Sequence, residues 1–261
     1  MKKFYVIGNN VSKSLSPTIF NYWFKKYKIK AKYGYLELNN KNFDKNIKKI
    51  LEKKETSGLN ITIPFKKRII THISQLEKHA KTINAVNCII VGKKVRGINT
   101  DWAGYYKTLP KPKKLKDKKI ILIGYGGAAL AIHYLLVNKG FKNIKIFNRS
   151  KKLLKFVDKK KYTLSINSLN KHLADACLII NTTPLNPINS NNKKLISKNT
   201  LLSDIVYKPK ETKFLSKFPE NKKIYGISML VEQAIPCFKH WVGFKPEVDS
   251  KLIKILDEKI K

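Results

Sequence analysis

The sequence predicts an α/β protein of two domains, each built around a mostly parallel sheet. Apolar, strand-like runs alternate with helix-like segments along the whole chain, which is typical of βαβ units. A Pro- and Lys-rich stretch without periodicity, residues 108–119, connects two series of these segments. With 261 residues, of which 43% are hydrophobic, the chain can form two hydrophobic cores.

The first series covers about one hundred residues and contains four predicted strands, at Phe4–Ile7, Tyr33–Leu38, Leu59–Ile63 and Ala85–Val91. Helical spacing of apolar residues predicts helices at Pro17–Tyr27, Phe43–Glu55 and Gln75–Lys81. The sequence GKKVRGIN, which begins at Gly92, predicts a short hairpin.

The second series predicts strands at Lys119–Ile123, Ile144–Phe147, Cys177–Asn181, Leu201–Asp204 and Ile224–Tyr225. Helices are predicted at Ala128–Asn138, Met229–His240 and Val248–Lys261, with Gly140 ending the first and Gly243 and Pro246 separating the other two.

One stretch of this series, residues 120–138, carries no formal charge and has the length of a membrane span. Gly124, Gly126 and Gly127 fall where a β-rich run gives way to helix formers. A strand, a tight turn and a buried helix explain these residues better, so we expect no membrane association.

The composition is strongly basic, with 55 Lys and Arg against 17 Asp and Glu and a net charge of +38. The lysines are spread over every segment instead of forming an arm, so we expect no nucleic-acid partner. The three cysteines are far apart and form no CxxC pair, which argues against a disulfide scaffold or a zinc site. The N-terminal apolar run is too short for a signal peptide, and a reducing, cytoplasmic location is predicted.

A glycine-rich turn, GYGGAA, follows the predicted strand 119–123 and opens the next helix. Gly124, Gly126 and Ala129 match the G-x-G-x-x-A dinucleotide fingerprint. The first glycine permits the tight turn, the second lets the backbone approach a pyrophosphate, and the small third residue lets helix and strand pack closely. The helix N-terminus then offers N–H groups to the phosphates.

The end of the next predicted strand indicates whether the dinucleotide is NAD or NADP. NAD sites carry Asp or Glu about 20 residues beyond the turn, to bind the ribose 2′-hydroxyl. Here the strand ends in Asn148, Arg149 and Ser150, with Lys151 and Lys152 beyond, and offers no carboxylate. A cationic group in this place favours the 2′-phosphate of NADP.

Candidate catalytic residues lie in the first series. In GLNITIPFKKR, Asn60 and Thr62 alternate on one face of a strand, and Lys66 follows its end. Asp101 follows the last short strand of the same series. A lysine and a carboxylate that meet near a bound hydroxyl or ketone can exchange a proton with it.

A further candidate site precedes the first helix, in the sequence SKSLSPTIFN from Ser12 to Asn21. Ser16 is predicted as the N-cap and Pro17 as the first helical residue. Capping does not require Ser14, so a second role is indicated for that hydroxyl.

Taken together these motifs resemble the shikimate dehydrogenase family, and the match runs from end to end in the family's order. The matching motifs are SLSP from Ser14, NITIPFK from Asn60, AVN ending at Asn87, NTD ending at Asp101, GYGGAA from Gly124, NRS from Asn148, NTTP from Asn181, DIVYKPKET from Asp204 and GISMLVEQA from Gly226.

The resemblance implies reduction of 3-dehydroshikimate to shikimate with NADPH, a step of aromatic amino-acid biosynthesis. It implies that Ser14 and Ser16 bind the substrate carboxylate and that Lys66 is the acid/base, oriented by Asp101. The ring hydroxyls would be bound by Asn60, Thr62, Asn87, Asp101 and Gln233, with Tyr207 close to the substrate.

For the cofactor, NADP(H), the resemblance implies contacts from Gly124, Gly126, Gly127, Ala128, Asn148, Arg149, Ser150, Lys152, Thr182, Ile205 and Gly226, and no metal. It further implies a substrate domain of residues 1–101 plus about 236–261, a Rossmann-type NADP domain of about 102–235, and an active-site cleft between them. A monomer or homodimer acting on a small-molecule substrate is expected.

Five positions depart from the family's usual residues, at Phe20, Asn84, Cys88, Trp102 and Asn186, where His, Gly, Thr, Gly and Gly are common. None removes a proposed catalytic group. The alternatives that stay open are a quinate/shikimate dehydrogenase using NAD, a relative that binds ligand without catalysis, and a basic nucleic-acid-binding protein.

Overall fold

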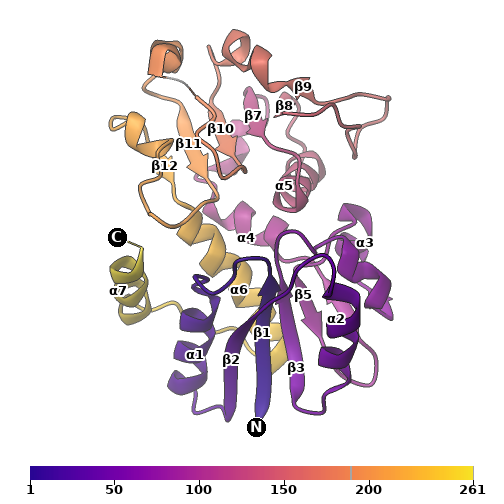
Figure 1. The fold of residues 1–261 in the computed structure, drawn as a ribbon. Coiled ribbons are helices and arrows are strands. Elements are labelled where there is room, and N and C mark those ends of the chain that lie inside the picture. The colour runs from indigo at the N-terminus through magenta and orange to yellow at the C-terminus, as the bar shows by residue number, and fades with distance from the viewer. Residues whose placement is uncertain (189, 261) are drawn as a thin grey trace. The chain divides into compact units, whose positions relative to one another are not determined.

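The computed structural model describes residues 1–188 and 190–260 and divides into two compact units. The first unit consists of Met1–Asp101 and Gln233–Lys259, and the second of Trp102–Glu232 together with Ile260. Figure 1 shows that each unit has its own sheet with helices packed on it.

The first unit contains a six-stranded mixed sheet in the order β2-β1-β3-β5-β6-β4. Its strands are β1 (Lys2–Gly8), β2 (Ala31–Glu37), β3 (Thr56–Ile61), β4 (Gln75–Leu76), β5 (Cys88–Ile90) and β6 (Arg96–Ile98). β1 is parallel to both of its neighbours, whereas β5 is antiparallel to β3 and β6. The hairpin predicted from Gly92 is confirmed as the connection between β5 and β6.

Helices cover both faces of this sheet. They are α1 (Ser16–Lys26), α2 (Phe43–Glu52), α3 (Lys78–Ile83), the second half of α6 (Gly226–Val242) and α7 (Ser250–Lys259), with a 3-10 helix at Arg68–His72. The face under α2 and α3 is mostly aliphatic, with Ile7, Leu59, Ile47 and Ala80 in one buried cluster. α7 lies beside α1 (Figure 1), where Asp249 accepts a hydrogen bond from Tyr22 and pairs with Lys26.

One helix prediction in this unit was wrong at its start. Gln75 and Leu76 form β4, which pairs with β6, and α3 begins only at Lys78. The backbone N–H of Gln75 donates to Val95 O, so a tertiary strand pairing overrides the local helical pattern.

The opposite face of the sheet is aromatic and explains a glycine in β3. The indole of Trp241 on α6 lies 4.9 Å from the ring of Phe4 and 5.0 Å from that of Phe20, and its N–H donates to Ile89 O at 2.9 Å. A Cβ at Gly58 would lie 2.3 Å from the indole nitrogen. The close approach of strand and indole therefore requires glycine here.

The second unit contains a six-stranded sheet in the order β12-β11-β10-β7-β8-β9, in which every pair is parallel. Its strands are β7 (Ile120–Ile123), β8 (Ile144–Asn148), β9 (Leu164–Ser165), β10 (Leu178–Asn181), β11 (Leu201–Asp204) and β12 (Lys223–Ile224). The chain leaves β7 toward β8 on one side and returns to β10 on the other. The order of strands reverses between β7 and β10, and such switch points bind ligands in doubly wound sheets.

The helices of the second unit are α4 (Asp101–Thr108, whose first residue belongs to the first unit), α5 (Gly127–Asn138) and the first half of α6. Short 3-10 helices occur at Pro112–Leu115, Ile166–His172, Ser190–Leu195 and Leu215–Lys217. The predicted succession of strand, turn and buried helix at residues 120–138 is confirmed by β7 and α5. In the described ranges, no helix is long and apolar enough to cross a membrane.

Two sequence predictions need adjustment in this region. The Pro- and Lys-rich stretch 108–119 does not separate the two units but lies inside the second one, between α4 and β7. α6 begins three residues earlier and ends two residues later than the predicted helix Met229–His240. It includes Pro236 in its interior, where the apolar pattern continues through the proline.

We predict that Gly58→Ala lowers the free energy of unfolding by about 1–3 kcal/mol, because the new methyl group meets an indole that neighbouring rings hold in place. Chemical denaturation measures this change. The matched control is Gly34→Ala in β2, where a Cβ would lie 3.4 Å from the Tyr5 ring, an ordinary contact. Equal stability of the two variants would contradict the argument.

Candidate active site

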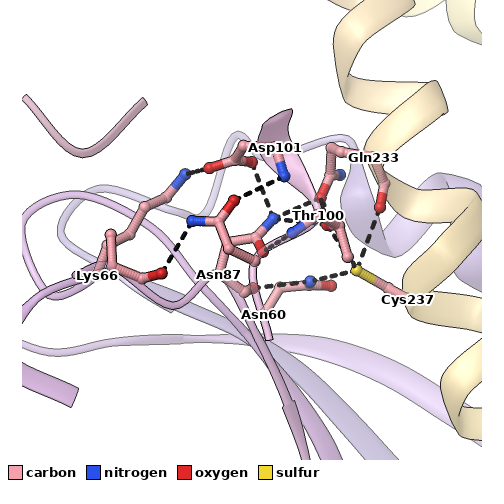
Figure 2. Close-up of polar contacts among 9 residues, drawn as sticks. Asn60, Lys66, Asn87, Thr100, Asp101, Gln233 and Cys237 are labelled. Atoms are coloured by element: carbon pink, nitrogen blue, oxygen red, sulfur yellow. Dashed lines mark hydrogen bonds and ion pairs between the residues drawn. The ribbon is translucent and has the colours of Figure 1, made fainter. Parts of the chain in front are cut away.

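Polar side chains from five segments of the first unit converge in one cluster (Figure 2). Asn60 comes from the end of β3, Lys66 from the turn that follows it, and Asn87 from the residue before β5. Asp101 begins α4 and Gln233 lies in α6. All five except Lys66 are less than a tenth exposed, so their hydrogen bonds are formed away from water.

The ion pair of the cluster joins Lys66 to Asp101. Lys66 Nζ lies 2.5 Å from Asp101 Oδ2, and the two side chains are 12% and 5% exposed. The backbone carbonyl of Lys66 accepts from the N–H of Val86 at 2.7 Å, which fixes the lysine turn to the chain leading into Asn87. The ammonium is thus held at a set place and is still reachable from solvent.

Asn87 holds the carboxylate from its other side. Its amide nitrogen donates to Asp101 Oδ1 and to Thr100 Oγ1, each at 2.8 Å, and contacts Gln233 Oε1 at 3.1 Å. Its amide oxygen accepts from the backbone N–H of Thr100 at 2.7 Å. These partners fix both the place and the flip of the amide, since only nitrogen can donate to a carboxylate.

Asn60 connects the cluster to Tyr33 and Cys237. Its amide nitrogen donates to Asn87 O at 3.0 Å and approaches Cys237 Sγ at 3.3 Å, and its oxygen accepts from the hydroxyl of Tyr33 at 2.7 Å. Cys237 also contacts Thr100 Oγ1 at 3.3 Å. Burial raises the pKa of the neighbouring Cys88 thiol, which keeps it protonated.

Sequence reasoning named Asn60, Lys66, Asn87, Asp101 and Gln233 and missed Tyr33, Thr100 and Cys237. Thr100 lies inside the NTD motif and could have been found there, because its hydroxyl precedes the catalytic candidate by one residue. Tyr33 and Cys237 are brought to Asn60 from 27 and 177 residues away. No local pattern indicates contacts of that kind.

Ser14 lies between β1 and α1 and Ser16 begins α1, and their helix-start roles differ from the prediction. Ser16 is the first helical residue, and the cap position belongs to Leu15, which makes no side-chain cap bond. Instead Ser14 Oγ accepts the backbone N–H of Ser16 at 3.2 Å. The prediction was wrong because Leu15 already has helical dihedral angles, so the helix begins one residue early.

Thr62 lies at the same sheet edge as the serine pair. It follows β3, and a Cβ placed on Gly8 at the end of β1 would lie 2.4 Å from its methyl carbon. Because β1 and β3 are parallel neighbours, their carboxyl ends bring Thr62, Asn60 and the start of α1 to one edge.

The glycine-rich turn of the second unit has the conformation that the fingerprint requires. Gly124 has a φ of +97°, and a Cβ there would lie 2.4 Å from Thr182 Oγ1. A Cβ on Gly126 would meet nothing within 4 Å, so the backbone is open to a ligand at that point. α5 begins at Gly127 with no acidic residue in its first turn, and Ala129 is buried against the sheet.

The neighbouring strand supplies Thr182, whose hydroxyl donates to Ile123 O at 2.6 Å beside the glycine turn. Asn181, one residue earlier, donates to Asp204 Oδ2 at 3.3 Å. Both residues stand at the switch point between β7 and β10. The turn, its open backbone and the helix start therefore fit a pyrophosphate group.

Ile205, Tyr207 and Gly226 follow β11 and β12. Ile205 and Tyr207 are half-buried, and Gly226 is the first residue of α6. A Cβ on Gly226 would lie 2.4 Å from Ile205 O and 2.5 Å from Val206 O. The helix can therefore start against this backbone only with glycine, which places Ile205 and Gly226 side by side.

At the end of β8, Asn148 donates to the carbonyl and hydroxyl oxygens of Ser150, and Arg149, Ser150 and Lys152 are exposed. Neither Arg149 nor Lys152 has an ion-pair partner in the described part of the chain. Their positive charges are available to an anionic ligand, as the 2′-phosphate prediction requires.

A buried histidine lies close to the glycine turn. Tyr125 occupies the variable position between Gly124 and Gly126, and its hydroxyl lies 2.9 Å from His133 Nδ1. Burial lowers the pKa of His133 to about 4, so the imidazole is neutral at neutral pH. Among the described residues, no group of three or more His, Cys, Asp or Glu could hold a metal ion.

A buried lysine–carboxylate pair in one unit and a glycine-rich turn at the switch point of the other are the features of a dinucleotide-dependent oxidoreductase. Comparison with known families agrees. A model described as "Shikimate dehydrogenase substrate binding domain" matches residues 6–89, and one described as "Shikimate / quinate 5-dehydrogenase" matches residues 107–211.

Relatives match over nearly the full length. The NADP(+) shikimate dehydrogenase of Pelagibacter ubique is 37% identical, with 98% of this chain and 99% of the relative covered. That of Staphylococcus aureus is 35% identical, with 98% of each covered. The crystal structure of the enzyme from Aquifex aeolicus has a TM-score of 0.86 at 32% identity, over 98% of this chain and 97% of the other. The chain belongs to the shikimate dehydrogenase family.

The structure accounts for two of the unusual residues. Asn84 ends α3 with a φ of +57°, a left-handed conformation that asparagine tolerates better than other non-glycine residues. Phe20 stacks on Tyr33 with ring centroids 4.6 Å apart, so it supports the tyrosine that binds Asn60. Nothing in the structure explains Asn186.

We predict that His133 makes stability depend on pH. Because its folded pKa lies below the unfolded value of 6.5, the unfolded state binds more protons between these values, and stability falls as pH falls. From pH 7 to pH 5 this group costs about 2 kcal/mol. Denaturation of wild type and His133→Gln at both pH values should show a smaller decrease for the variant; parallel decreases would contradict the prediction.

Proposed function

We propose that the protein catalyses the reversible, NADPH-dependent reduction of 3-dehydroshikimate to shikimate, a step of aromatic amino-acid biosynthesis. The observation that carries this proposal is the pairing of Lys66 Nζ with Asp101 Oδ2 at 2.5 Å, with Asn87 holding the other carboxylate oxygen. Family membership supplies the substrate class, because the relatives carry the name shikimate dehydrogenase (NADP(+)).

In the reduction, Lys66 gives a proton to the ketone oxygen of the substrate. When bound, NADPH supplies the hydride that reaches the carbonyl carbon. Asp101 keeps the ammonium in place and stabilises its charge, and Asn87 keeps the carboxylate from turning. In the reverse direction Lys66 takes the hydroxyl proton as hydride leaves, so atoms and charge balance in both directions.

The first unit supplies the substrate-binding groups. Ser14 and Ser16 would bind the substrate carboxylate at the N-terminus of α1, where the helix dipole also favours an anion. The ring hydroxyls would be bound by Asn60, Thr62, Asn87, Asp101 and Gln233, with Tyr207 of the second unit close to the substrate. Residues 1–101 and about 236–261 form the substrate domain in this proposal.

Residues of about 102–235 form the NADP domain. Its contacts would be the glycine turn from Gly124 to Ala128, the cationic segment from Asn148 to Lys152, and Thr182, Ile205 and Gly226. The open backbone at Gly126 and the unpaired charges of Arg149 and Lys152 support this assignment. We further propose a cytoplasmic enzyme that acts as a monomer or homodimer.

A second candidate function is the oxidation of quinate or shikimate with NAD. It is favoured by the description of the model that matches residues 107–211, which includes quinate. Arg149, which suits a 2′-phosphate and not a free hydroxyl, argues against it. Nucleic-acid binding has no comparable support, because the positive charge is dispersed.

The test follows nicotinamide absorbance with shikimate or quinate and with NADP⁺ or NAD⁺. We expect rapid reduction of NADP⁺ with shikimate, and a kcat lowered about 10²- to 10⁴-fold in Lys66→Ala, because the proton acceptor is lost. Lys49→Ala, which changes an exposed lysine of α2, should leave the rate unchanged.

The outcomes separate the candidates. Turnover restricted to NAD⁺ or quinate would establish the second candidate and refute the role of Arg149. Turnover of shikimate that Lys66→Ala does not reduce would refute the assigned acid/base. The absence of turnover with every pair would show that the motifs serve a protein without this activity.

A further inference from the structure

The segment that follows β8 is unusual for a connection between parallel strands. Residues 149–163, termed the basic strap here, lead from β8 to β9 without an α-helix, although such connections usually contain one. The strap carries seven cationic residues and one acid, Asp158; the cations are Arg149, Lys151, Lys152, Lys155, Lys159, Lys160 and Lys161.

The strap is closed on itself by backbone hydrogen bonds. Leu154 N donates to Lys161 O and Thr163 N donates to Lys152 O, each at 2.8 Å. Thr163 Oγ1 accepts from Lys152 N at 3.0 Å and approaches Ser150 O at 3.3 Å. These bonds give the strap a hairpin-like shape, but they do not attach it to the rest of the unit.

Among the hydrogen bonds of residues 1–188 and 190–260, one bond, to a side-chain hydroxyl, attaches the strap to the glycine turn. The backbone N–H of Lys155 donates to Tyr125 Oη at 2.9 Å, and Tyr125 stands between the two glycines that face the predicted pyrophosphate site. The next strap residue, Phe156, has a φ of +64°, which is uncommon for a bulky residue, and its ring packs 5.3 Å from that of His133. Packing against α5 thus holds the strap at this point.

Chemistry fixes the direction of one of the two hydrogen bonds of Tyr125, since a backbone N–H can only donate. Tyr125 Oη accepts from Lys155, so its own proton is free to be donated to His133 Nδ1 at 2.9 Å. This direction holds in the tautomer whose Nδ1 is unprotonated. Burial keeps the imidazole neutral, and burial also raises the pKa of Tyr125, so the phenol keeps the proton that it donates. With a neutral imidazole and a protonated phenol, the hydrogen bonds from Lys155 to Tyr125 and between Tyr125 and His133 can both form.

We propose that the Tyr125–His133 pair is a positioning device that fixes the basic strap relative to the glycine turn, so that the cations of the strap bind the 2′-phosphate of NADP. The proposal rests on the cofactor assignment made above. Tyr125 would act through the strap, since its hydroxyl contacts Lys155 and not the ligand. A backbone that is already fixed loses less conformational entropy when the Arg and Lys side chains that it carries bind a ligand.

The binding of two nucleotides distinguishes positioning of the strap for the 2′-phosphate from general support of the fold. Adenosine 2′,5′-bisphosphate carries the 2′-phosphate, and 5′-AMP lacks it. Tyr125→Phe removes one hydroxyl and keeps the ring. In calorimetric titrations we expect its Kd for the bisphosphate to rise about tenfold and its Kd for 5′-AMP to change less than about twofold, since a lost hydrogen bond is worth about 1 kcal/mol.

The matched control is Tyr162→Phe, which removes a hydroxyl from the strap itself. Tyr162 is exposed and its ring lies under Lys151, but its hydroxyl is not part of the link to the glycine turn. We expect both dissociation constants to stay unchanged. In turnover assays Tyr125→Phe should raise KM for NADP⁺ and leave kcat and KM for shikimate as they are. Hydrogen exchange at the Lys155 amide should become faster.

Each other outcome overturns the proposal. Equal weakening of both nucleotides in Tyr125→Phe would show that the hydroxyl supports only the glycine turn, and no weakening would show that the strap needs no anchor. A wild type that does not prefer the bisphosphate would show that the strap does not bind a 2′-phosphate. A wild type that prefers the bisphosphate without oxidising shikimate would refute the proposed function alone, and the variant would still decide this inference.

Discussion

The side-chain amide of Asn87 is the contact on which the rest of the first unit's polar cluster depends. It donates to the carboxylate of Asp101 and accepts from the backbone of Thr100, so it fixes where the carboxylate points. The second carboxylate oxygen is left for Lys66. Without this hold, Asp101 could turn toward other donors, and the ammonium would lose its fixed place. The geometry of the proposed acid/base pair is therefore set by a neutral residue, and the placement of the charged pair follows from it.

Topology explains how side chains so far apart in the sequence reach Asn87. β1 and β3 are parallel neighbours whose carboxyl ends share one edge, and the antiparallel β5 starts there because it runs the opposite way. Asn60 at the end of β3 and Asn87 before β5 must therefore lie close together, and Asn60 donates to Asn87 O. The same rule puts the glycine turn after β7 beside Thr182 after β10 in the second unit. In both units the reactive edge follows from strand direction.

This rule also defines how far sequence reasoning could go. The strands, the glycine turn and the residues at strand ends follow local patterns, and Asn60, Lys66 and Asp101 were predicted as site residues in that way. Tyr33 and Cys237 contact Asn60 only because the sheet and α6 fold over each other, and no local pattern encodes such a contact. The predicted start of the helix at Gln75 was wrong for the same reason. Gln75 lies in a strand instead, because its backbone N–H donates to the carbonyl of Val95. Ser16 lost the predicted cap position to Leu15, because Leu15 adopts helical dihedral angles, which the identity of a residue does not dictate.

Two carboxylates are buried in the described part of this very basic chain, and they show why a motif cannot by itself reveal a residue's role. Both Asp101 and Asp204 belong to motifs shared with the family. Asp101 faces an ammonium group, whereas Asp204 is bound by neutral donors, namely Thr212 Oγ1, the Asn181 amide and the backbone of Val206. Burial raises the pKa of Asp204, and its hydrogen bonds to neutral donors lower it only in part. The chain has 55 Lys and Arg, so the lack of a cationic partner for Asp204 among the described residues is a matter of where the cations lie and not of how many there are. Asp204 thus ties the ends of β10 and β11 together, whereas Asp101 pairs with Lys66, as the proposed proton transfer requires.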